Sequence, residues 1–334
     1  MSTTVAPSPV SAPWVWTADE LTARDDWVIQ VDDNGLADIA AALEGVKSRG
    51  LSIKDIRAED FPLPSMADDL AAVKDALAHG PGVCLLRGVP VDRYGREDIE
   101  IILWGLGTHV GRAIVQSFRG DVIGEVMDKS HEGDTRRAYR SPDALSLHID
   151  SVDVAALLCL RRAKRGGMSL VTSSFAVHNA ILNERPDLIP LLYRGYHCMH
   201  SEADSTGEDP MTPYRIPVFG PVGDHLICNF HARPMARSLG VGDLGSDPKS
   251  LEALEVFKEI AEREQLLHRR MLEPGDLQFL NNRTVLHGRT DFEDHAGLDQ
   301  KRLMLRLWLT MPDWAPMPDN MVSHPERQLK PEEL

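Results

Sequence analysis

A histidine and an aspartate stand two residues apart in the stretch LSLHIDSVDV, residues 145–154. Polarity alternates along this stretch, with apolar residues at Leu145, Leu147 and Ile149 and polar residues at Ser146, His148 and Asp150. A β-strand with this period sends the two sets to opposite faces. The polar face is then either a solvated surface or a pair of metal ligands, His148 and Asp150, directed at one point.

Two histidines and one carboxylate form the ligand set of non-heme Fe(II) oxygenases, and this set leaves coordination positions open on the metal. His148 and Asp150 would supply two ligands, so the third must come from a distant segment. The chain has 13 histidines, and a later histidine alone is therefore weak evidence. His287, in NNRTVLHGRT, is the candidate because it ends a strand-like run just before a strand with two arginines.

That basic strand, RLMLRLWLT at 302–310, has two chemically different faces. Leucines at 303, 305, 307 and 309 share one face, and the other carries Arg302, Met304, Arg306, Trp308 and Thr310. At ~3.3 Å per residue the two arginines would lie about 13 Å apart along the strand. Their face is either solvated or turned into the ligand cavity of a barrel.

The elements that would position these residues are mostly short. Apolar runs between turn residues predict strands over 82–88, 154–160, 165–174, 214–219, 225–230, 266–271, 277–282 and 284–289. Apolar periodicity predicts helices over 66–79, 95–106, 175–194 and 250–264, with Pro186 starting a second piece of the third. We expect Ser65 to cap the first helix, and the last helix to bury Leu251, Leu254, Phe257 and Ile260. The predicted fold is mostly β, with a double-stranded β-helix (jelly-roll) core and flanking helices.

Composition narrows the class of protein. The 334 residues carry a net charge of −15, which disfavours nucleic acid and anionic membranes as partners. The four cysteines lie in apolar surroundings without a C-x-x-C pair, which indicates a reducing, cytoplasmic setting. No stretch has the pattern of a signal peptide or a membrane span. Residues 1–13 are predicted to be disordered, and residues 14–334 to form one domain with its core at about 80–312.

Four stretches together resemble the TauD/TfdA type of Fe(II)- and 2-oxoglutarate-dependent dioxygenases, of the clavaminate synthase-like superfamily. They are YRSPDALSLHIDSVDVAALLCL, RRAKRGGMSLVTSS, EPGDLQFLNNRTVLHGRTDFED and KRLMLRLWL. The order of H-x-D, glycine turn, late His-Gly-Arg block and Arg-x-x-x-Arg strand makes the resemblance specific. It covers roughly residues 80–312 and implies the same double-stranded β-helix.

The resemblance also implies roles for individual residues. His148, Asp150 and His287 match the three iron ligands of the family. Arg302, fifteen positions after His287, matches the arginine that pairs with the far carboxylate of 2-oxoglutarate. A guanidinium fork suits that role because it binds a carboxylate through two parallel hydrogen bonds.

Two further positions match less closely. Ser169 matches a hydroxyl, usually of threonine, that contacts the same carboxylate, although Met168 stands where an acidic residue is common. Arg306 matches a position that holds an anionic substrate group in some relatives. The alternative for Arg306 is a charge on the cofactor side.

The implied activity is that of a non-heme iron dioxygenase, an oxidoreductase whose cofactors are Fe(II), 2-oxoglutarate as co-substrate and O2. It would couple oxidative decarboxylation of 2-oxoglutarate, to succinate and CO2, with hydroxylation of a small organic substrate, for which the match at Arg306 suggests an anionic group. Desaturation, cyclisation or oxidative cleavage in natural-product tailoring remain open, because the ligand set does not separate them. A non-catalytic or zinc-binding β-barrel is the alternative of another class, and iron-dependent succinate formation would exclude it. A homo-oligomer is also possible.

Overall fold

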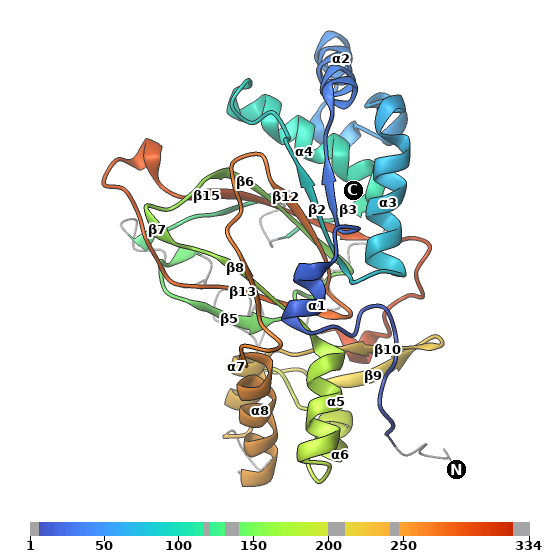
Figure 1. The fold of residues 1–334 in the computed structure, drawn as a ribbon, viewed down its shortest axis with the longest axis vertical. Helices are drawn as coiled ribbons and strands as arrows, with labels where there is room; N and C mark the ends of the chain where they lie inside the picture. The colour runs from blue at the N-terminus through green and yellow to red at the C-terminus, as the bar shows by residue number, and fades with distance from the viewer. Residues whose placement is uncertain (1–6, 117–120, 131–139, 200–210, 241–246, 323–334) are drawn as a thin grey trace.

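The computed structural model describes residues 7–116, 121–130, 140–199, 211–240 and 247–322 (Figure 1). Its largest sheet has seven strands, in the order β1 (Val28–Gln30), β2 (Val83–Arg87), β12 (Leu277–Asn281), β6 (Val154–Arg161), β15 (Leu303–Thr310) and β3 (Arg112–Ala113), with β4 (Ile123–Val126) also paired to β15. A four-stranded sheet follows the order β11 (His268–Arg270), β8 (Ser169–Ser173), β13 (Val285–Arg289) and β5 (Leu145–His148). Two small sheets pair β9 (Phe219–Val222) with β10 (His225–Cys228), and β7 (Arg165–Gly166) with β14 (Phe292–Glu293).

The seven-stranded and four-stranded sheets pack face to face. Val83, Cys159 and Met304 of the large sheet share one apolar cluster with Val171 and Val285 of the small sheet. Helices cover the outer faces (Figure 1). The architecture is the predicted double-stranded β-helix with flanking helices.

Each outer face has its own helical layer. The large sheet is covered by α2 (Asp33–Arg49), α3 (Ala67–Ala78) and α4 (Arg96–Val110), and the small sheet by α5 (Ser174–Glu184), α6 (Ile189–Arg194) and α8 (Pro248–Ala261). The remaining α-helices are α1 (Ala18–Ala23) and α7 (Ala232–Ser238), and short 3-10 turns occur at Ile53–Asp55, Ala58–Asp60, Pro64–Met66, Leu298–Gln300 and Asp319–Met321. In the described part of the chain, no helix combines the length and apolarity that crossing a membrane requires.

The predicted two-faced strands determine what points into the barrel. On β15 the buried leucines 305, 307 and 309 pack in the cluster that contains α4, so Arg306 and Trp308 face the opposite way. On and just after β5, Leu147 and Ile149 pack in the cluster that contains α5 and α8. His148 therefore points toward the space between the two sheets.

Several local predictions were wrong. Ser65 does not cap α3, because a 3-10 turn precedes that helix and Met66 occupies the cap position without a side-chain cap bond. Leu251 is 39% exposed, whereas Leu254, Phe257 and Ile260 are buried. Side chains three residues apart on a helix of 3.6 residues per turn differ in direction by about 60°. Over the steps from Ile260 back to Leu251 this difference adds up, and Leu251 lies outside the buried face.

The strand predicted over 214–219 begins only at Phe219, and Ile216 forms just an isolated bridge with Tyr196. Pro213 and Pro217 lack amide hydrogens for a longer ladder. The second helix of the 175–194 segment begins at Ile189 rather than Pro186.

The pattern analysis also missed α2. That helix has clear local signals, because the Asp32 side chain accepts a hydrogen bond from the Gly35 amide at its start. Gly50 ends the helix with φ +64°, a conformation that suits glycine. The predicted domain boundaries stay predictions. Of the N-terminal segment 1–13, residues 1–6 lie outside the described ranges. Within the rest, the Val10 amide donates to Asn179 Oδ1, and Asn179 Nδ2 donates to the Val10 carbonyl oxygen.

Candidate metal centre

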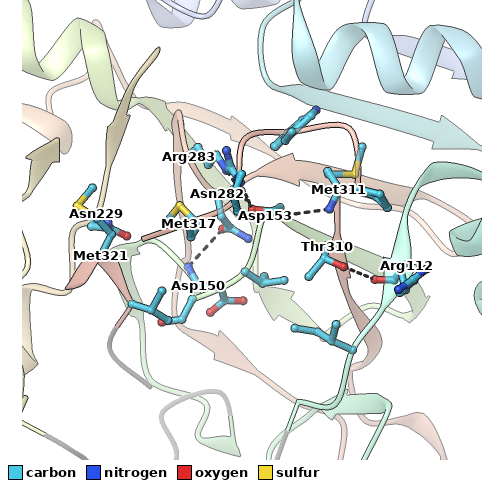
Figure 2. Close-up of a pocket in the computed structure, with 17 residues that line it drawn as sticks. Arg112, Asp150, Asp153, Asn229, Asn282, Arg283, Thr310, Met311, Met317 and Met321 are labelled. Carbon is cyan, nitrogen blue, oxygen red and sulfur yellow. Dashed lines mark hydrogen bonds and ion pairs between the residues drawn. The ribbon is translucent and has the colours of Figure 1, made fainter. Parts of the chain in front are cut away.

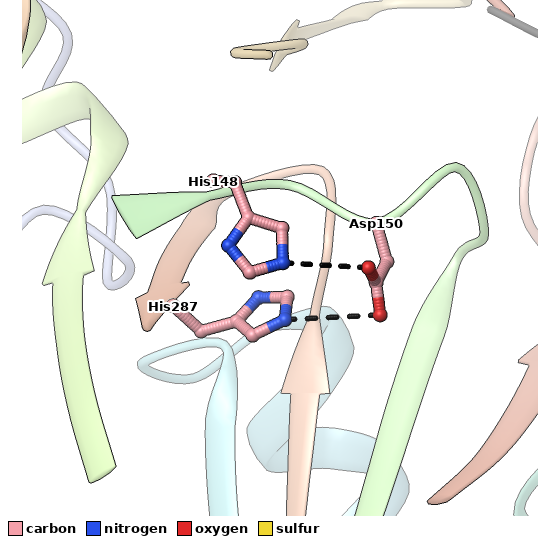
Figure 3. A group of neighbouring side chains, drawn as sticks. All are labelled: His148, Asp150 and His287. Carbon is pink, nitrogen blue, oxygen red and sulfur yellow. Dashed lines mark ion pairs between the residues drawn. The ribbon is translucent and has the colours of Figure 1, made fainter. Parts of the chain in front are cut away.

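Three side chains predicted to bind a metal converge between the sheets (Figure 3). His148, on β5, lies directly opposite His287, on β13, and Asp150 follows β5 by two residues. One ligand atom from each residue lies within 4.8 Å of the other two. His148 Nε2 is 3.5 Å from Asp150 Oδ1, and His287 Nε2 is 3.7 Å from Asp150 Oδ2.

The hydrogen bond of His148 fixes which ring nitrogen is free. Its Nδ1 lies 2.9 Å from the Ser146 carbonyl oxygen, which can only accept, so Nδ1 carries the hydrogen. The lone pair of the neutral ring is then on Nε2, the atom that faces Asp150. A metal-bound histidine uses its other nitrogen in this way to hold the ring in place.

Burial and neighbouring charges set the protonation states at the centre. Burial opposes ionisation of Asp150, but Arg306 and the two imidazoles outweigh it and hold the pKa of this carboxyl well below its usual range. Burial, then the proximity of His148, lowers the pKa of His287 to about 3. Near neutral pH the site therefore offers a carboxylate and a neutral imidazole, the forms that bind a metal.

Neighbouring groups hold Asp150 in position. Trp308 Nε1 donates to Asp150 Oδ2 at 2.9 Å, and the Asp150 amide donates to Asn282 Oδ1 at 3.3 Å. Two imidazoles and an oriented carboxylate suit ferrous iron and leave room for other ligands. The residues present therefore fit an iron centre.

Arg302 lies beside this centre with its charge unmatched. It is 6% exposed, its guanidinium forms no ion pair with a carboxylate in the described ranges, and its buried Nη1 has no hydrogen-bond partner there. Its guanidinium carbon lies 5.3 Å from the centre of the Phe292 ring. Burial lowers the pKa of Arg302. Among the described residues the guanidinium contacts the Met304 sulfur, through Nη2, and the Phe292 ring, but no carboxylate. A buried guanidinium in that state is costly, so its presence points to a bound anion.

A cavity of about 50 Å³ joins Arg302 to the metal centre. Its lining includes His148, Ser169, His287, Arg289, Arg302 and Arg306. The structure thus brings together all the predicted site residues except Asp150, which lies next to the two histidines. Ser169 Oγ donates to Gln278 Oε1 at 2.8 Å, so its hydroxyl oxygen can still accept but its hydrogen is engaged.

The glycine turn before β8 packs against the same arginine. Gly166 and Gly167 have φ of +71° and +75°, which only glycine adopts readily. A Cβ atom at Gly167 would lie 3.1 Å from Arg302 Nε. The turn therefore allows the backbone to approach the guanidinium closely.

The guanidinium of Arg306 lies between the side chains of Gln116 and Asp150. Its Nε donates to Gln116 Oε1 at 2.9 Å, and its Nη1 is 3.5 Å from Asp150 Oδ2. Its guanidinium carbon stands 4.5 Å from the centre of the Trp308 ring. Arg306 and Arg302 both line the small cavity.

A larger cavity, of about 430 Å³, opens on the other side of Asp150 (Figure 2). Asn229, Asn282 and Arg112 line it, together with residues of the segment 311–322. Asp153 and Arg283 form a buried ion pair of 2.6 Å in its wall. Asp153 Oδ2 also accepts from the Met311 amide, which ties the segment after β15 to the cavity.

Sequence reasoning missed several residues in or beside these cavities. Arg289 and Asn229 line them, while Trp308 and Gln278 hydrogen-bond to Asp150 and Ser169. Trp308 had a usable signal, because it shares a strand face with Arg306 and so must point inward. Arg289 belongs to the His-Gly-Arg block that carries the resemblance, but no role was predicted for it. Gln278 and Asn229 had no signal, since each is an ordinary polar residue in an apolar segment. The stretch YHCMH at 196–200 contains buried Cys198, and His197 Nδ1 lies 2.7 Å from the Thr212 carbonyl oxygen. His200 lies outside the described ranges.

Comparison with known proteins gives a family match over most of the chain. A family model described as "Taurine catabolism dioxygenase TauD, TfdA family" matches residues 47–308. A protein of Streptomyces rubellomurinus named FR-33289 synthase is 31% identical over 323 residues, which cover 95% of this chain and 94% of that protein. A "Taurine hydroxylase-like protein SAT17" of Stachybotrys chartarum is 28% identical, over 92% of this chain and 84% of that protein.

Solved structures share the fold at low sequence identity. An asparagine oxygenase in complex with Fe(II), 2S,3S-3-hydroxyasparagine and succinate superposes with a TM-score of 0.69 at 16% identity, covering 85% of this chain and 93% of that one. The non-heme iron oxygenase OrfP in complex with Fe and alpha-ketoglutaric acid gives a TM-score of 0.62 at 15% identity, with coverage of 85% and 93%.

Proposed function

Because this chain belongs to the TauD/TfdA family of dioxygenases, and is thus a non-heme iron oxygenase that uses 2-oxoglutarate, we propose that it hydroxylates a small organic substrate. Oxidative decarboxylation of 2-oxoglutarate, to succinate and CO2, accompanies that step. His148, Asp150 and His287 hold Fe(II). Iron bound there supplies the activation of O2 and the oxidation of a C–H bond.

Arg302 binds the far carboxylate of 2-oxoglutarate. Its buried guanidinium has no carboxylate partner among the described residues, and two parallel hydrogen bonds to a carboxylate would satisfy it. Ser169 has an oxygen in the same cavity that accepts hydrogen bonds, and Gln278 orients its hydroxyl. Ser169 therefore has a positioning role beside the co-substrate.

Arg306 acts on the cofactor side. Its charge next to Asp150 keeps that carboxyl ionised, and Gln116 fixes the direction of its guanidinium. Trp308 donates to the same carboxylate and limits its rotation. These contacts order the metal ligands before any substrate arrives, which reduces the reorganisation needed during the reaction.

Oxidative tailoring of a natural product is the more specific role that we favour. FR-33289 synthase, which matches nearly the full length of this chain, is named for making a particular product. The solved structures name hydroxylated amino acids as bound products, which supports hydroxylation as an outcome on this fold. Desaturation, cyclisation and cleavage use the same ligand set and are distinguished by product analysis.

The observation that carries the proposal is the pair of opposed histidines with Asp150, next to a buried arginine that has no carboxylate partner among the residues the structure describes. The test is anaerobic addition of Fe(II) and then 2-oxoglutarate to the metal-free protein. We expect a weak visible charge-transfer band, followed by iron-dependent succinate formation when O2 is admitted. A folded protein that shows neither would return the zinc-binding or non-catalytic barrel to first place.

A further inference from the structure

Two buried carboxamide groups line the 430 Å³ cavity without using their donor capacity. Asn229 is 3% exposed and Asn282 is 2% exposed. The Nδ2 atoms of both are buried and have no hydrogen-bond partner among the residues described here. Leaving such a donor buried and unpaired is costly, so two in one cavity indicate a ligand that pairs them.

The orientation of Asn282 follows from its other bond. Its Oδ1 accepts from the Asp150 amide at 3.3 Å, which leaves Nδ2 as the free end. The donor is thus held next to a residue assigned to the metal. Figure 2 shows Asn282, Asn229 and Asp150 around the same cavity.

The charges around the cavity favour a ligand with negative character. Arg283 is engaged by Asp153, with Nε and Nη2 both donating to Oδ1 at 2.9 and 2.6 Å. Arg112, exposed and among the lining residues, forms no ion pair within the described ranges. Asp150, which also lines the cavity, faces Arg306 and the proposed metal, so Arg112 is the lining charge that has no ion pair in the described ranges.

The remaining wall is largely apolar. It is formed by Met311, Trp314, Met317, Met321 and Val322 of the segment after β15. Such a wall suits a hydrocarbon portion of the ligand. Arg306, the residue that the resemblance connects with anionic substrates, lies in the other cavity.

Building on the proposed function, we propose that this cavity binds the organic substrate through an oxygen group that only accepts hydrogen bonds, attached to a short apolar segment. Asn229 and Asn282 donate to that group, and Arg112 favours its anionic forms, carboxylate or phosphonate. A group that only donates, such as an ammonium, would leave both amides unpaired and is rejected. Asn229 is then a specificity-determining residue whose side-chain amide nitrogen forms no hydrogen bond to a proposed metal ligand among the described residues.

Four six-carbon probes test this assignment by isothermal titration calorimetry: hexanoate, hexylphosphonate, hexanamide and hexylamine. One arm uses anaerobic protein saturated with Fe(II) and 2-oxoglutarate, so that Arg302 is occupied. The other arm uses metal-free Arg302→Leu protein, which needs neither iron nor co-substrate and lacks the competing anion site. In both arms we expect the three oxygen probes to bind and hexylamine to fail.

Variants then assign the binding to named residues. Asn229→Leu keeps the side-chain volume and is expected to weaken all three oxygen probes about tenfold or more, the cost of one hydrogen bond to a buried group. Arg112→Gln should weaken hexanoate and hexylphosphonate but not hexanamide. Asn34→Leu, an exposed asparagine on α2, is the matched control and should change nothing.

The outcomes separate the two proposals. Three results would each overturn the inference. Hexylamine could bind as tightly as hexanoate, the Asn229→Leu variant could bind the oxygen probes within about twofold of the parent, or no probe could bind at all. Preference between hexanoate and hexylphosphonate identifies a planar or a tetrahedral group. Probe binding in the Arg302→Leu arm without an Fe(II)–2-oxoglutarate band in the parent would refute the proposed function alone.

Discussion

His148 and His287 lie directly opposite each other across the antiparallel pair of β5 and β13, with their ring centres 4.4 Å apart. The register of one strand pair therefore determines the spacing of two proposed ligands. A shift by one residue would turn one imidazole to the outer face, where Leu147 and Leu286 pack. Asp150 lies two residues beyond the end of β5, and its carboxylate oxygens are 3.5 and 3.7 Å from the two imidazoles.

Removal of a proposed ligand should abolish turnover while the fold survives. Asp150→Ala and His287→Ala are expected to reduce iron-dependent succinate formation by more than about 100-fold, the upper range for loss of an outer contact alone. Circular dichroism would verify folding, and His79→Ala, an exposed histidine, is the control. Substantial turnover in either folded ligand variant would refute the ligand assignment.

Arg302→Leu should separate stability from function. The variant removes a buried charge that has no carboxylate partner in the described part of the chain, so the metal-free protein should unfold at an equal or higher urea concentration. Binding of 2-oxoglutarate, followed by the visible band with Fe(II), should fall by about tenfold or more. Arg302→Lys keeps the charge without the planar fork and should also bind weakly. A large loss of stability in Arg302→Leu would mean that the guanidinium is structural.

Gly167→Ala should impair co-substrate binding through the backbone. A residue other than glycine at φ +75° is strained by about 1–2 kcal/mol, and the added Cβ would press on Arg302 Nε. We expect a higher KM for 2-oxoglutarate with metal affinity retained. The control is Gly45→Ala in α2, where a Cβ meets nothing within 4 Å. That change should stabilise the protein by about 0.5–1 kcal/mol.

The ion pair between Asp153 and Arg283 should be a major structural contact. Asp153→Ala leaves a buried guanidinium unpaired and removes the acceptor of the Met311 amide, so we expect a loss of about 3–5 kcal/mol in the free energy of unfolding. Urea unfolding would measure it. Asp26→Asn, which breaks the exposed pair with Arg24, should cost far less. Equal losses in the two variants would contradict this account.

The four cysteines should be unreactive in the native protein. All are free and buried, and burial raises the pKa of Cys84, Cys159 and Cys198 to about 12, and that of Cys228 still further. Because the thiolate is the reactive form, a disulfide exchange reagent at pH 8 should label no cysteine until denaturant is added. Rapid labelling of any of them in the native state would show local opening that this structure does not contain.

The sequence was sufficient to predict which residues could share a face. Strand alternation is a local property of the backbone, so the segments around His148 and along 302–310 showed which residues share a face, although not whether that face points inward. Helix boundaries were less secure, as Ser65, Leu251 and the missed α2 show. The end of a helix and the direction of a single side chain depend on one or two residues. Packing of the helix against the sheet readily overrides such local preferences.

What the sequence by itself determined is the chemistry available: a histidine and a carboxylate on one face, a late histidine, and two arginines on one strand. Only the tertiary structure decided how they meet. Strand pairing set His148 against His287, and the packing of two sheets buried Arg302 without a carboxylate partner in the described ranges, placed Arg306 beside Asp150, and brought Asn229 to the second cavity. These relationships join segments far apart in the chain, and they depend on register and packing that no local pattern records.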